Sequence, residues 1–259
     1  MLPAGRTGPE ELDHVVAMLF NHPNTGPFIS RQLIQRLVTS NPSPAYVYRV
    51  ARIFAGNGSG TRGDLGAVVR AILTDPEARS KEVAATQGFG KLREPLIRVA
   101  HLWRAFEATA SEGRFDFAWT RDRIGQEVLQ SPTVFNFFQP DYITPGPAAD
   151  AGLVAPEFQI ATDGNLAHFI NTIDWFAWRT SENSKDPVLD ITAEAALVSN
   201  PDALLDRLDL LMLSGSMTPE LRARLRTLLT DLPNWYDPNE RVRSVIFTLI
   251  TSPDYAVQK

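Results

Sequence analysis

Apolar residues recur every three or four positions along most of the chain, which is the period of an amphipathic helix. No stretch keeps the two-residue alternation of a half-buried strand, so the pattern does not support a β-sheet. Prolines and glycines mostly fall between the periodic stretches and divide the chain into segments of helical length. We therefore predict an all-α fold, an irregular multi-helix globular bundle of roughly ten helices with a long ordered proline-rich loop.

Capping residues predict where several of these helices begin. Thr7 and Glu10 have the spacing of a capping box, and Asp237–Glu240 caps the last long helix. Ser43–Pro44 and Thr218–Pro219 each place proline at the first helical position. The helix that starts after Thr7 has an apolar stripe, formed by Leu12, Val15, Val16, Leu19 and Phe20.

Two polar linkers, residues 80–91 and 180–190, interrupt the helical pattern. Three helices rich in leucine, valine and isoleucine follow the second linker. We predict a main helical domain over residues 1–185, which contains an aromatic loop and helix. We predict a C-terminal three-helix subdomain over residues 186–259 that packs on it.

The segment from Glu127 to Arg179 is the richest in polar side chains next to large aromatic ones. A helix is predicted over residues 120–129, and a short helix over Phe135–Phe138 follows it. The loop over residues 139–161 contains four prolines, which favour extended backbone. Because apolar side chains anchor this loop, we expect it to be ordered. Long ordered loops are often functional.

A helix follows this loop, with Thr162 or Asp163 as its N-cap. One face of this helix is predicted to be buried, and consists of Leu166, Phe169, Ile170, Ile173, Phe176 and Ala177. A second face carries His168, Asn171, Trp175 and Trp178. Two tryptophans on the second face suggest that the preceding loop or a ligand covers it.

Composition and charge narrow the function classes. The chain has 259 residues, a formal net charge of −5 and no cysteine. Nucleic acid is not an expected partner, because phosphate binding needs a basic face and none is evident. Without cysteine, disulfides, thiolate nucleophiles and cysteine-ligated zinc are all excluded.

No apolar run has the length needed to span a membrane, so no membrane span is predicted. The N-terminal residues lack the continuous apolar core of a signal peptide. We therefore expect the polypeptide, as written, to stay in the cytoplasm.

A glycine-rich loop over residues 56–64 precedes a helix. Such loops can bind phosphate, but the spacing here fits neither nucleotide fingerprint, and we interpret the loop as a connector. Asn57, Ser59, Thr61 and Asp64 could offer oxygens to calcium, although their spacing is not that of an EF-hand.

Five stretches together resemble a known family, and they are residues 22–47, 57–79, 91–106, 129–146 and 242–258. The sequences of these stretches are similar to those of the bacterial family of unknown function DUF1800. The resemblance implies a helical fold and supplies no mechanism, since the family has no established activity. Its members are typically longer, exported proteins. The chain therefore resembles their C-terminal portion, with any signal peptide in the part before it.

The sharpest functional hypothesis is a hydrolase that cleaves ester or phosphoester bonds in a small-molecule or polymer substrate. Glu157, Asp163 and His168 are the candidate catalytic residues, because they combine carboxylates with a histidine near the start of one helix. A divalent metal is the candidate cofactor, with His168, His22 and Asp163 as ligands. No spacing motif supports this metal site, and each histidine is also explained by capping or packing.

Two alternatives remain open. The first is a non-catalytic helical interaction module, a fragment of a larger exported protein, which binds a partner through the aromatic loop and helix. A homodimer could cover surface that truncation leaves open. The second alternative is a glycoside hydrolase with paired carboxylates near tryptophans, drawn from Asp141, Glu157, Asp163 and Asp174.

Overall fold

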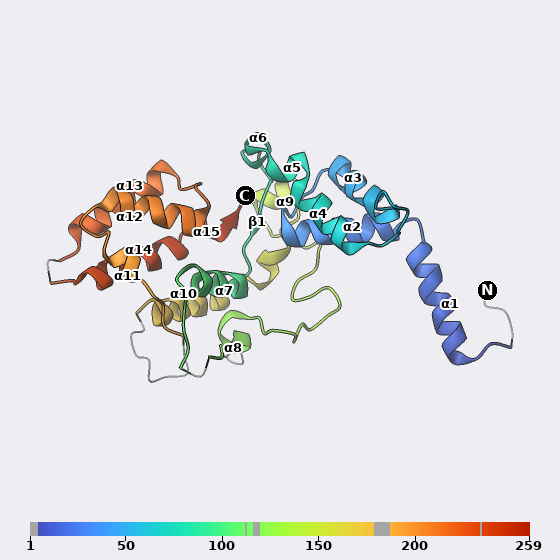
Figure 1. The fold of residues 1–259 in the computed structure, drawn as a ribbon, viewed down its shortest axis with the longest axis horizontal. Helices are drawn as coiled ribbons and strands as arrows, with labels where there is room; N and C mark the ends of the chain where they lie inside the picture. The colour runs from blue at the N-terminus through green and yellow to red at the C-terminus, as the bar shows by residue number, and fades with distance from the viewer. Residues whose placement is uncertain (1–4, 112, 116–119, 179–186, 234) are drawn as a thin grey trace. The chain divides into compact units, whose positions relative to one another are not determined.

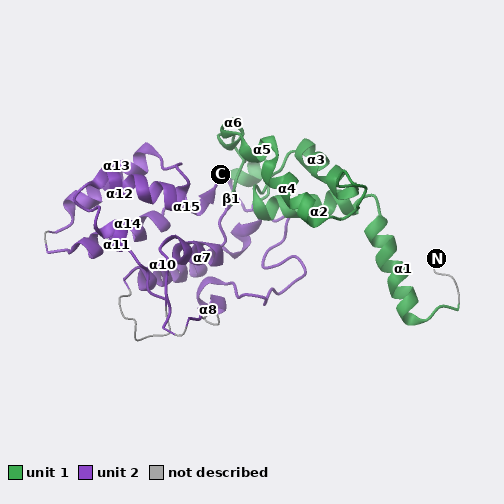
Figure 2. Cartoon of the chain, viewed as in Figure 1, with its two compact units in different colours: residues 1–91, 147–154, 259 green, residues 92–146, 155–258 purple. Residues whose placement is uncertain are grey.

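The structure is a computed structural model that describes residues 5–111, 113–115, 120–178, 187–233 and 235–259. It confirms the all-α prediction, with fifteen α-helices among the described residues (Figure 1). The count exceeds the predicted ten because five helices of only four residues each, α5, α6, α9, α11 and α15, separate the longer ones. The chain forms two compact units (Figure 2).

Unit 1 consists of residues 1–91, 147–154 and 259. Its helices are α1 (Gly8–Asn21), α2 (Thr25–Leu37), α3 (Pro44–Ala55), α4 (Leu65–Thr74), α5 (Pro76–Arg79), α6 (Lys81–Ala84) and α9 (Pro147–Asp150). Helices α2, α3 and α4 pack against one another. They enclose a core of Ile34, Tyr46, Val50, Phe54, Val68 and Ile72.

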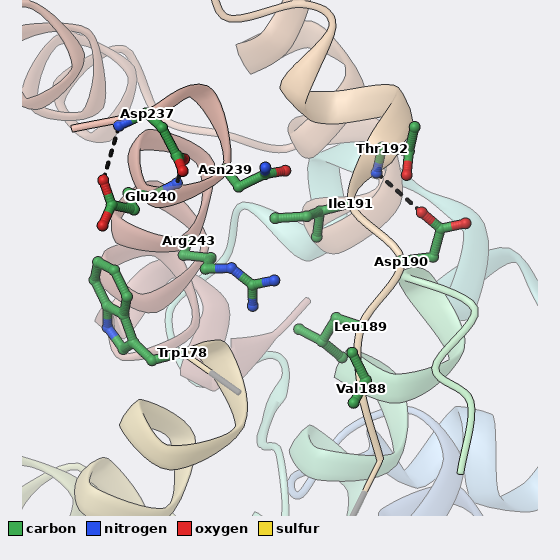
Figure 3. A pocket seen from close by; sticks show the side chains of 10 residues that line it. All are labelled: Trp178, Val188, Leu189, Asp190, Ile191, Thr192, Asp237, Asn239, Glu240 and Arg243. Atoms are coloured by element: carbon green, nitrogen blue, oxygen red, sulfur yellow. Dashed lines mark hydrogen bonds between the residues drawn. The ribbon is translucent and has the colours of Figure 1, made fainter. Parts of the chain in front are cut away.

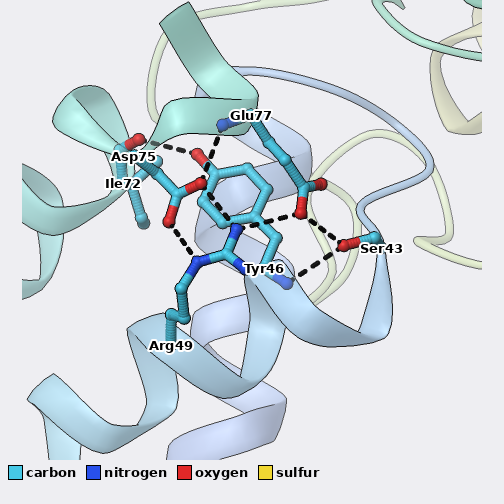
Figure 4. Close-up of polar contacts among 6 residues, drawn as sticks. All are labelled: Ser43, Tyr46, Arg49, Ile72, Asp75 and Glu77. Carbon is cyan, nitrogen blue, oxygen red and sulfur yellow. Dashed lines mark hydrogen bonds and ion pairs between the residues drawn. The ribbon is translucent and has the colours of Figure 1, made fainter. Parts of the chain in front are cut away.

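A polar network ties α3 to the turn between α4 and α5 (Figure 4). The Arg49 guanidinium donates to both carboxylate oxygens of Asp75, at 2.8 and 2.7 Å, and to Glu77 at 2.9 Å. The Tyr46 hydroxyl donates to the Ile72 carbonyl at 2.7 Å. Ser43 caps α3 as predicted, because its Oγ accepts the Tyr46 N–H at 3.0 Å.

Unit 2 consists of residues 92–146 and 155–258. Its helices are α7 (Pro95–Ala105), α8 (Thr120–Ile124), the 3₁₀ turn η1 (Pro156–Ile160), α10 (Asp163–Trp178), α11 (Thr192–Ala195), α12 (Pro201–Leu208), the π-helical turn η2 (Asp209–Leu213), α13 (Pro219–Asp231), α14 (Pro238–Ile250) and α15 (Pro253–Ala256). Helix α14 is central, since α10, α11, α13 and α15 all contact it. Two short strands, β1 (Lys91–Leu92) and β2 (Val257–Gln258), form a two-stranded sheet.

The hydrophobic core of unit 2 combines residues from both sides of the 180–190 segment, among them Phe176 and Ile246. The domain boundary predicted after residue 185 lies outside the described residues, and it stays a prediction. The predicted caps Thr218 and Asp237 are confirmed. Each accepts a backbone N–H of the first turn of its helix.

Two local predictions in the aromatic segment are wrong. Residues 135–138 do not form a helix, because Asn136 has a φ of 76° and an isolated bridge joins it to Thr133. The helix predicted over residues 120–129 ends at Ile124. Gly125 follows it with a φ of 72°, the left-handed conformation in which a glycine ends a helix.

The loop over residues 139–161 is ordered by hydrogen bonds within each unit. In unit 2, the Ala155 N–H donates to the Tyr142 carbonyl at 2.8 Å, and the Gln139 N–H donates to the Gln159 side chain at 2.7 Å. In unit 1, the Val154 N–H donates to Asn41 Oδ1 at 2.9 Å. Among the described residues, no helix has both the length and the apolar character that crossing a membrane requires.

Candidate functional site

The three predicted catalytic residues all belong to unit 2. Glu157 lies in η1 and is 1% exposed, whereas Asp163 begins α10 and His168 lies on an exposed side of that helix. Over the described ranges, no group of three histidine, cysteine or acidic residues could hold a metal ion. The catalytic roles of Glu157, Asp163 and His168 therefore stay predictions, and no metal-binding cluster among the described residues supports them.

The third predicted metal ligand, His22, belongs to unit 1. It is the C-cap of α1, and its Nδ1 accepts the Asn24 N–H at 3.2 Å. His22 therefore has the capping role that the sequence offered as the alternative to metal ligation, and its Nδ1 is engaged by this hydrogen bond. The metal set of His22, Asp163 and His168 thus combines residues of both units and stays a prediction.

Helix α10 is buried along a narrower face than its sequence pattern predicts. Phe169, Ile173, Phe176 and Ala177 are buried, and Thr162 caps the helix by accepting the Asn165 N–H at 3.3 Å. Leu166 and Ile170, predicted to be buried, are 40% and 44% exposed. The reason is that α10 packs mainly on α14 and α8, which together cover only part of its apolar stripe.

A cavity of about 470 Å³ lies in unit 2 where the end of α10 meets the start of α14 (Figure 3). Its size is typical of small-molecule pockets, which measure about 300–1,000 Å³. Trp178, the last residue of α10, forms one wall, and Asn239, Glu240 and Arg243 extend from α14. The other wall is the extended segment Val188–Thr192.

This extended segment is fixed to α7 and the residues after it. Thr109 and Val188 exchange two backbone hydrogen bonds of 2.9 and 2.8 Å, and the Asp190 N–H donates to the Phe106 carbonyl at 2.9 Å. Leu189 and Ile191 are each 3% exposed and belong to the core. This wall of the cavity is therefore anchored to the core through Leu189 and Ile191.

Arg243 is the charged residue at the centre of the cavity. It is 6% exposed, and its guanidinium points into the space between Trp178 and Leu189 (Figure 3). The guanidinium also donates to the carbonyl of Ala177, near the C-terminus of α10, where a positive charge is favourable. Burial lowers the pKa of Arg243, and the nearby Asp237 carboxylate opposes this effect.

Three carboxylates, those of Asp190, Asp237 and Glu240, line the cavity, and among them Asp237 acts on the charge of Arg243. Asp237 and Glu240 form the capping box of α14, in which each carboxylate accepts the other's backbone N–H at 2.8 Å. Asp190 accepts the Thr192 N–H at 3.0 Å, and hydrogen bonds from Thr192 lower the pKa of Asp190. All three carboxylates are thus held in place with a local donor.

The glycine-rich loop of unit 1 has the structure of a connector. Asn57 Oδ1 accepts hydrogen bonds from the backbone and hydroxyl of Ser59 and from the Thr61 N–H, at 3.1, 2.7 and 3.1 Å. Asp64 accepts from Asn57 Nδ2 at 2.7 Å and caps α4. The oxygens considered for calcium are therefore engaged in bonds that shape the loop.

Helix α1 presents an exposed apolar surface on unit 1. None of its residues is buried, and the exposed fractions of Leu12, Val16 and Leu19 are 64%, 55% and 57%. Figure 2 shows that it extends away from the other helices of its unit. The predicted apolar stripe is therefore present on α1. Phe20 at its end contacts Phe54, with ring centroids 6.1 Å apart, whereas Leu12, Val16 and Leu19 stay exposed among the described residues of this unit.

The C-terminal end of α1 is fixed to unit 1 by Arg62. The guanidinium donates to the Phe20 carbonyl at 3.1 and 3.0 Å and to the His22 carbonyl at 3.2 Å. It also lies over the rings of Phe20 and Phe54, 5.5 and 5.1 Å from their centroids. Arg62 thus holds the base of α1 and leaves Leu12, Val16 and Leu19 of the apolar stripe exposed.

Sequence reasoning missed the cavity, although Arg243 gave a signal. It lies three and seven positions before Ile246 and Ile250, which are buried on α14, so it shares a face with core residues. A charged residue at a core-facing helical position is uncommon and marks a buried polar contact. Trp178 lies 65 positions earlier in the chain, a pairing that no local pattern indicates.

The chain belongs to a family described as protein of unknown function (DUF1800), which matches residues 2–257. This match confirms the resemblance seen in the sequence. No curated protein and no solved structure matches the chain significantly.

Proposed function

We propose that this member of the DUF1800 family is a non-catalytic helical interaction module. Its docking element is α1, and the partner of α1 is the same helix of a second copy of the chain. The observation that carries the proposal is the apolar stripe of α1, a helix without one buried residue.

Physical chemistry supports a partner for this stripe. A helix of 14 residues is marginal in water on its own, and packing of an apolar face is what usually stabilises such helices. Burying one leucine or valine side chain contributes about 1.5–3 kcal/mol. Pairing two copies of α1 would bury several such side chains on each helix.

The charges of α1 favour an antiparallel pair. Glu10, Glu11 and Asp13 lie near its N-terminus, and α1 contains neither lysine nor arginine. A parallel pair would place these acidic groups side by side. An antiparallel pair centred between Val15 and Val16 places them near the partner's C-terminal end, where Arg62 is bound.

Light scattering and cysteine cross-linking test this arrangement, and the natural chain has no cysteine to interfere. The mass should be that of a dimer at high concentration. In the antiparallel pair Leu12 lies opposite Leu19, so a mixture of Leu12→Cys and Leu19→Cys proteins should form a disulfide-linked dimer on oxidation. Ala17→Cys lies on the polar face of α1 and serves as the control that should not cross-link.

Each other outcome contradicts the proposal. Efficient cross-linking of Leu12→Cys with itself would indicate a parallel pair. Equal cross-linking of Ala17→Cys would indicate random collision. A monomeric mass without specific cross-links would exclude the pairing altogether.

The second proposal is a hydrolase of ester or phosphoester bonds, with Glu157, Asp163 and His168 as its catalytic residues. Its support is the burial of Glu157, since a carboxylate is rarely buried without a structural or functional partner. The test is turnover of an ester and phosphoester panel, with and without zinc, manganese or calcium. His168→Ala should abolish turnover, because the proposal makes His168 a catalytic residue. It should leave the helical circular dichroism intact, because His168 is exposed. Turnover by this variant at the wild-type rate would exclude His168.

A further inference from the structure

We propose that the cavity between α10 and α14 of unit 2 is a binding site for a neutral, hydroxyl-rich ligand, namely an oligosaccharide (Figure 3). The inference is independent of the role of α1, because every residue that lines the cavity belongs to unit 2.

The aromatic wall supplies the surface on which a sugar ring can stack. Trp178 is 37% exposed at the end of α10. Its indole is held by an edge contact with Tyr236, at 6.4 Å between centroids and an interplanar angle of 77°. Sugar rings present an apolar C–H face, and a fixed indole offers that face a large contact area with little loss of conformational entropy.

The polar lining supplies donors and acceptors in the mixture that hydroxyl groups require. Arg243 and Asn239 can donate, and Asn239, Asp190, Asp237 and Glu240 can accept. A carboxylate has about four acceptor positions, so the capping hydrogen bonds of Asp237 and Glu240 leave room for ligand hydroxyls. Each hydroxyl of a sugar can donate and accept at once, which matches this lining.

The charges of the lining select against anionic ligands. Three carboxylates and one guanidinium leave a net formal charge of −2, which disfavours a phosphate or carboxylate ligand. The Arg243 guanidinium points into the cavity and would repel a cation placed beside it (Figure 3). A neutral polyol meets neither repulsion.

The carboxylates of the site are held in fixed positions, which suits binding. Asp237 and Glu240 are fixed by their capping box, and Asp190 is held by Thr192. A general acid must be protonated near neutral pH, yet hydrogen bonding lowers the pKa of Asp190. These carboxylates therefore orient a ligand, as preorganised groups do in rigid binding sites.

Titration calorimetry with short neutral oligosaccharides tests the site. The panel is β-1,4-linked glucose, α-1,4-linked glucose, xylose, mannose and N-acetylglucosamine oligomers, with a sulfated oligosaccharide as the anionic comparison. At least one neutral member should bind in the millimolar range or tighter and change the tryptophan fluorescence. The sulfated ligand should bind more weakly than its neutral counterpart.

Two substitutions connect binding to the cavity. Trp178→Ala should weaken binding by about tenfold, the usual effect of losing one packed aromatic contact. Asn239→Ala removes an exposed polar group and should also weaken binding. Trp235→Ala is the matched control, because Trp235 is 74% exposed and does not line the cavity. Its ring contacts Tyr236 in a tilted geometry, with centroids 4.4 Å apart.

Three results would overturn the inference. The first is no binding by any neutral oligosaccharide at millimolar concentration. The second is tighter binding of the sulfated ligand. The third is binding that is unchanged in Trp178→Ala and Asn239→Ala and lost in Trp235→Ala. That result would place the ligand on the exposed surface around Trp235.

Discussion

At the scale of single residues, Arg49 and Asp75 form the best-defined ion pair of unit 1 (Figure 4). Asp75 is 7% exposed, and burial alone would raise its pKa. The hydrogen bonds from Arg49 and from the Glu77 N–H outweigh burial, so the pKa of Asp75 is lowered. A lowered pKa means that the ionised form stabilises the fold above the pKa of the unfolded chain, which is about 3.9 for aspartate.

Arg49→Ala is expected to destabilise unit 1 by about 1–3 kcal/mol at neutral pH, because it leaves a buried carboxylate without its cation. The loss should shrink as the pH falls below about 4, where Asp75 becomes protonated in the variant and then in the wild type. Amide hydrogen exchange in α3 and α4 measures this locally. Tryptophan fluorescence does not report on unit 1, since its residues include no tryptophan.

Arg52→Ala is the matched control, because Arg52 is an exposed arginine on the same helix. It should change stability by less than about 0.5 kcal/mol at both pH values. If the effect of Arg49→Ala were equally large at acidic pH, its origin would be lost packing of the side chain and not the charge on Asp75.

At the scale of elements, helix starts were predictable because their signals are local. Ser43, Asp64, Thr218 and Asp237 each accept an N–H from their own first turn, so residues within four positions decide the outcome. The FNFF segment failed because Asn136 adopts a left-handed conformation, which amino-acid periodicity does not report.

Burial was harder to predict than helicity for a physical reason. Periodicity identifies an apolar face, but the neighbours that cover it come from distant parts of the chain. The stripes of α1 and α10 look alike in sequence, yet Phe169 and Ile173 of α10 are buried and no residue of α1 is. The cavity was missed for the same reason, since Trp178 and Arg243 meet only through the packing of α10 on α14.

At the scale of the whole molecule, each unit has its own buried cluster, and among the described α-helices of more than four residues α1 alone contributes to neither cluster. Under the proposed pairing, association with a second copy covers the exposed stripe of α1. The stability that this association adds then depends on protein concentration, whereas the stability of the two cores does not.

The midpoint of thermal unfolding of α1 and its unit should therefore rise with concentration, by roughly 1–3 °C for each tenfold increase. Val16→Glu places a carboxylate in the apolar stripe and should abolish this dependence and the dimer together. Ala17→Glu adds the same charge at the next position, on the polar face, and should leave both unchanged. Circular dichroism melting at several concentrations provides the measurement. A wild-type midpoint that is independent of concentration, or equal effects of the two substitutions, would show that α1 does not pair through its apolar stripe.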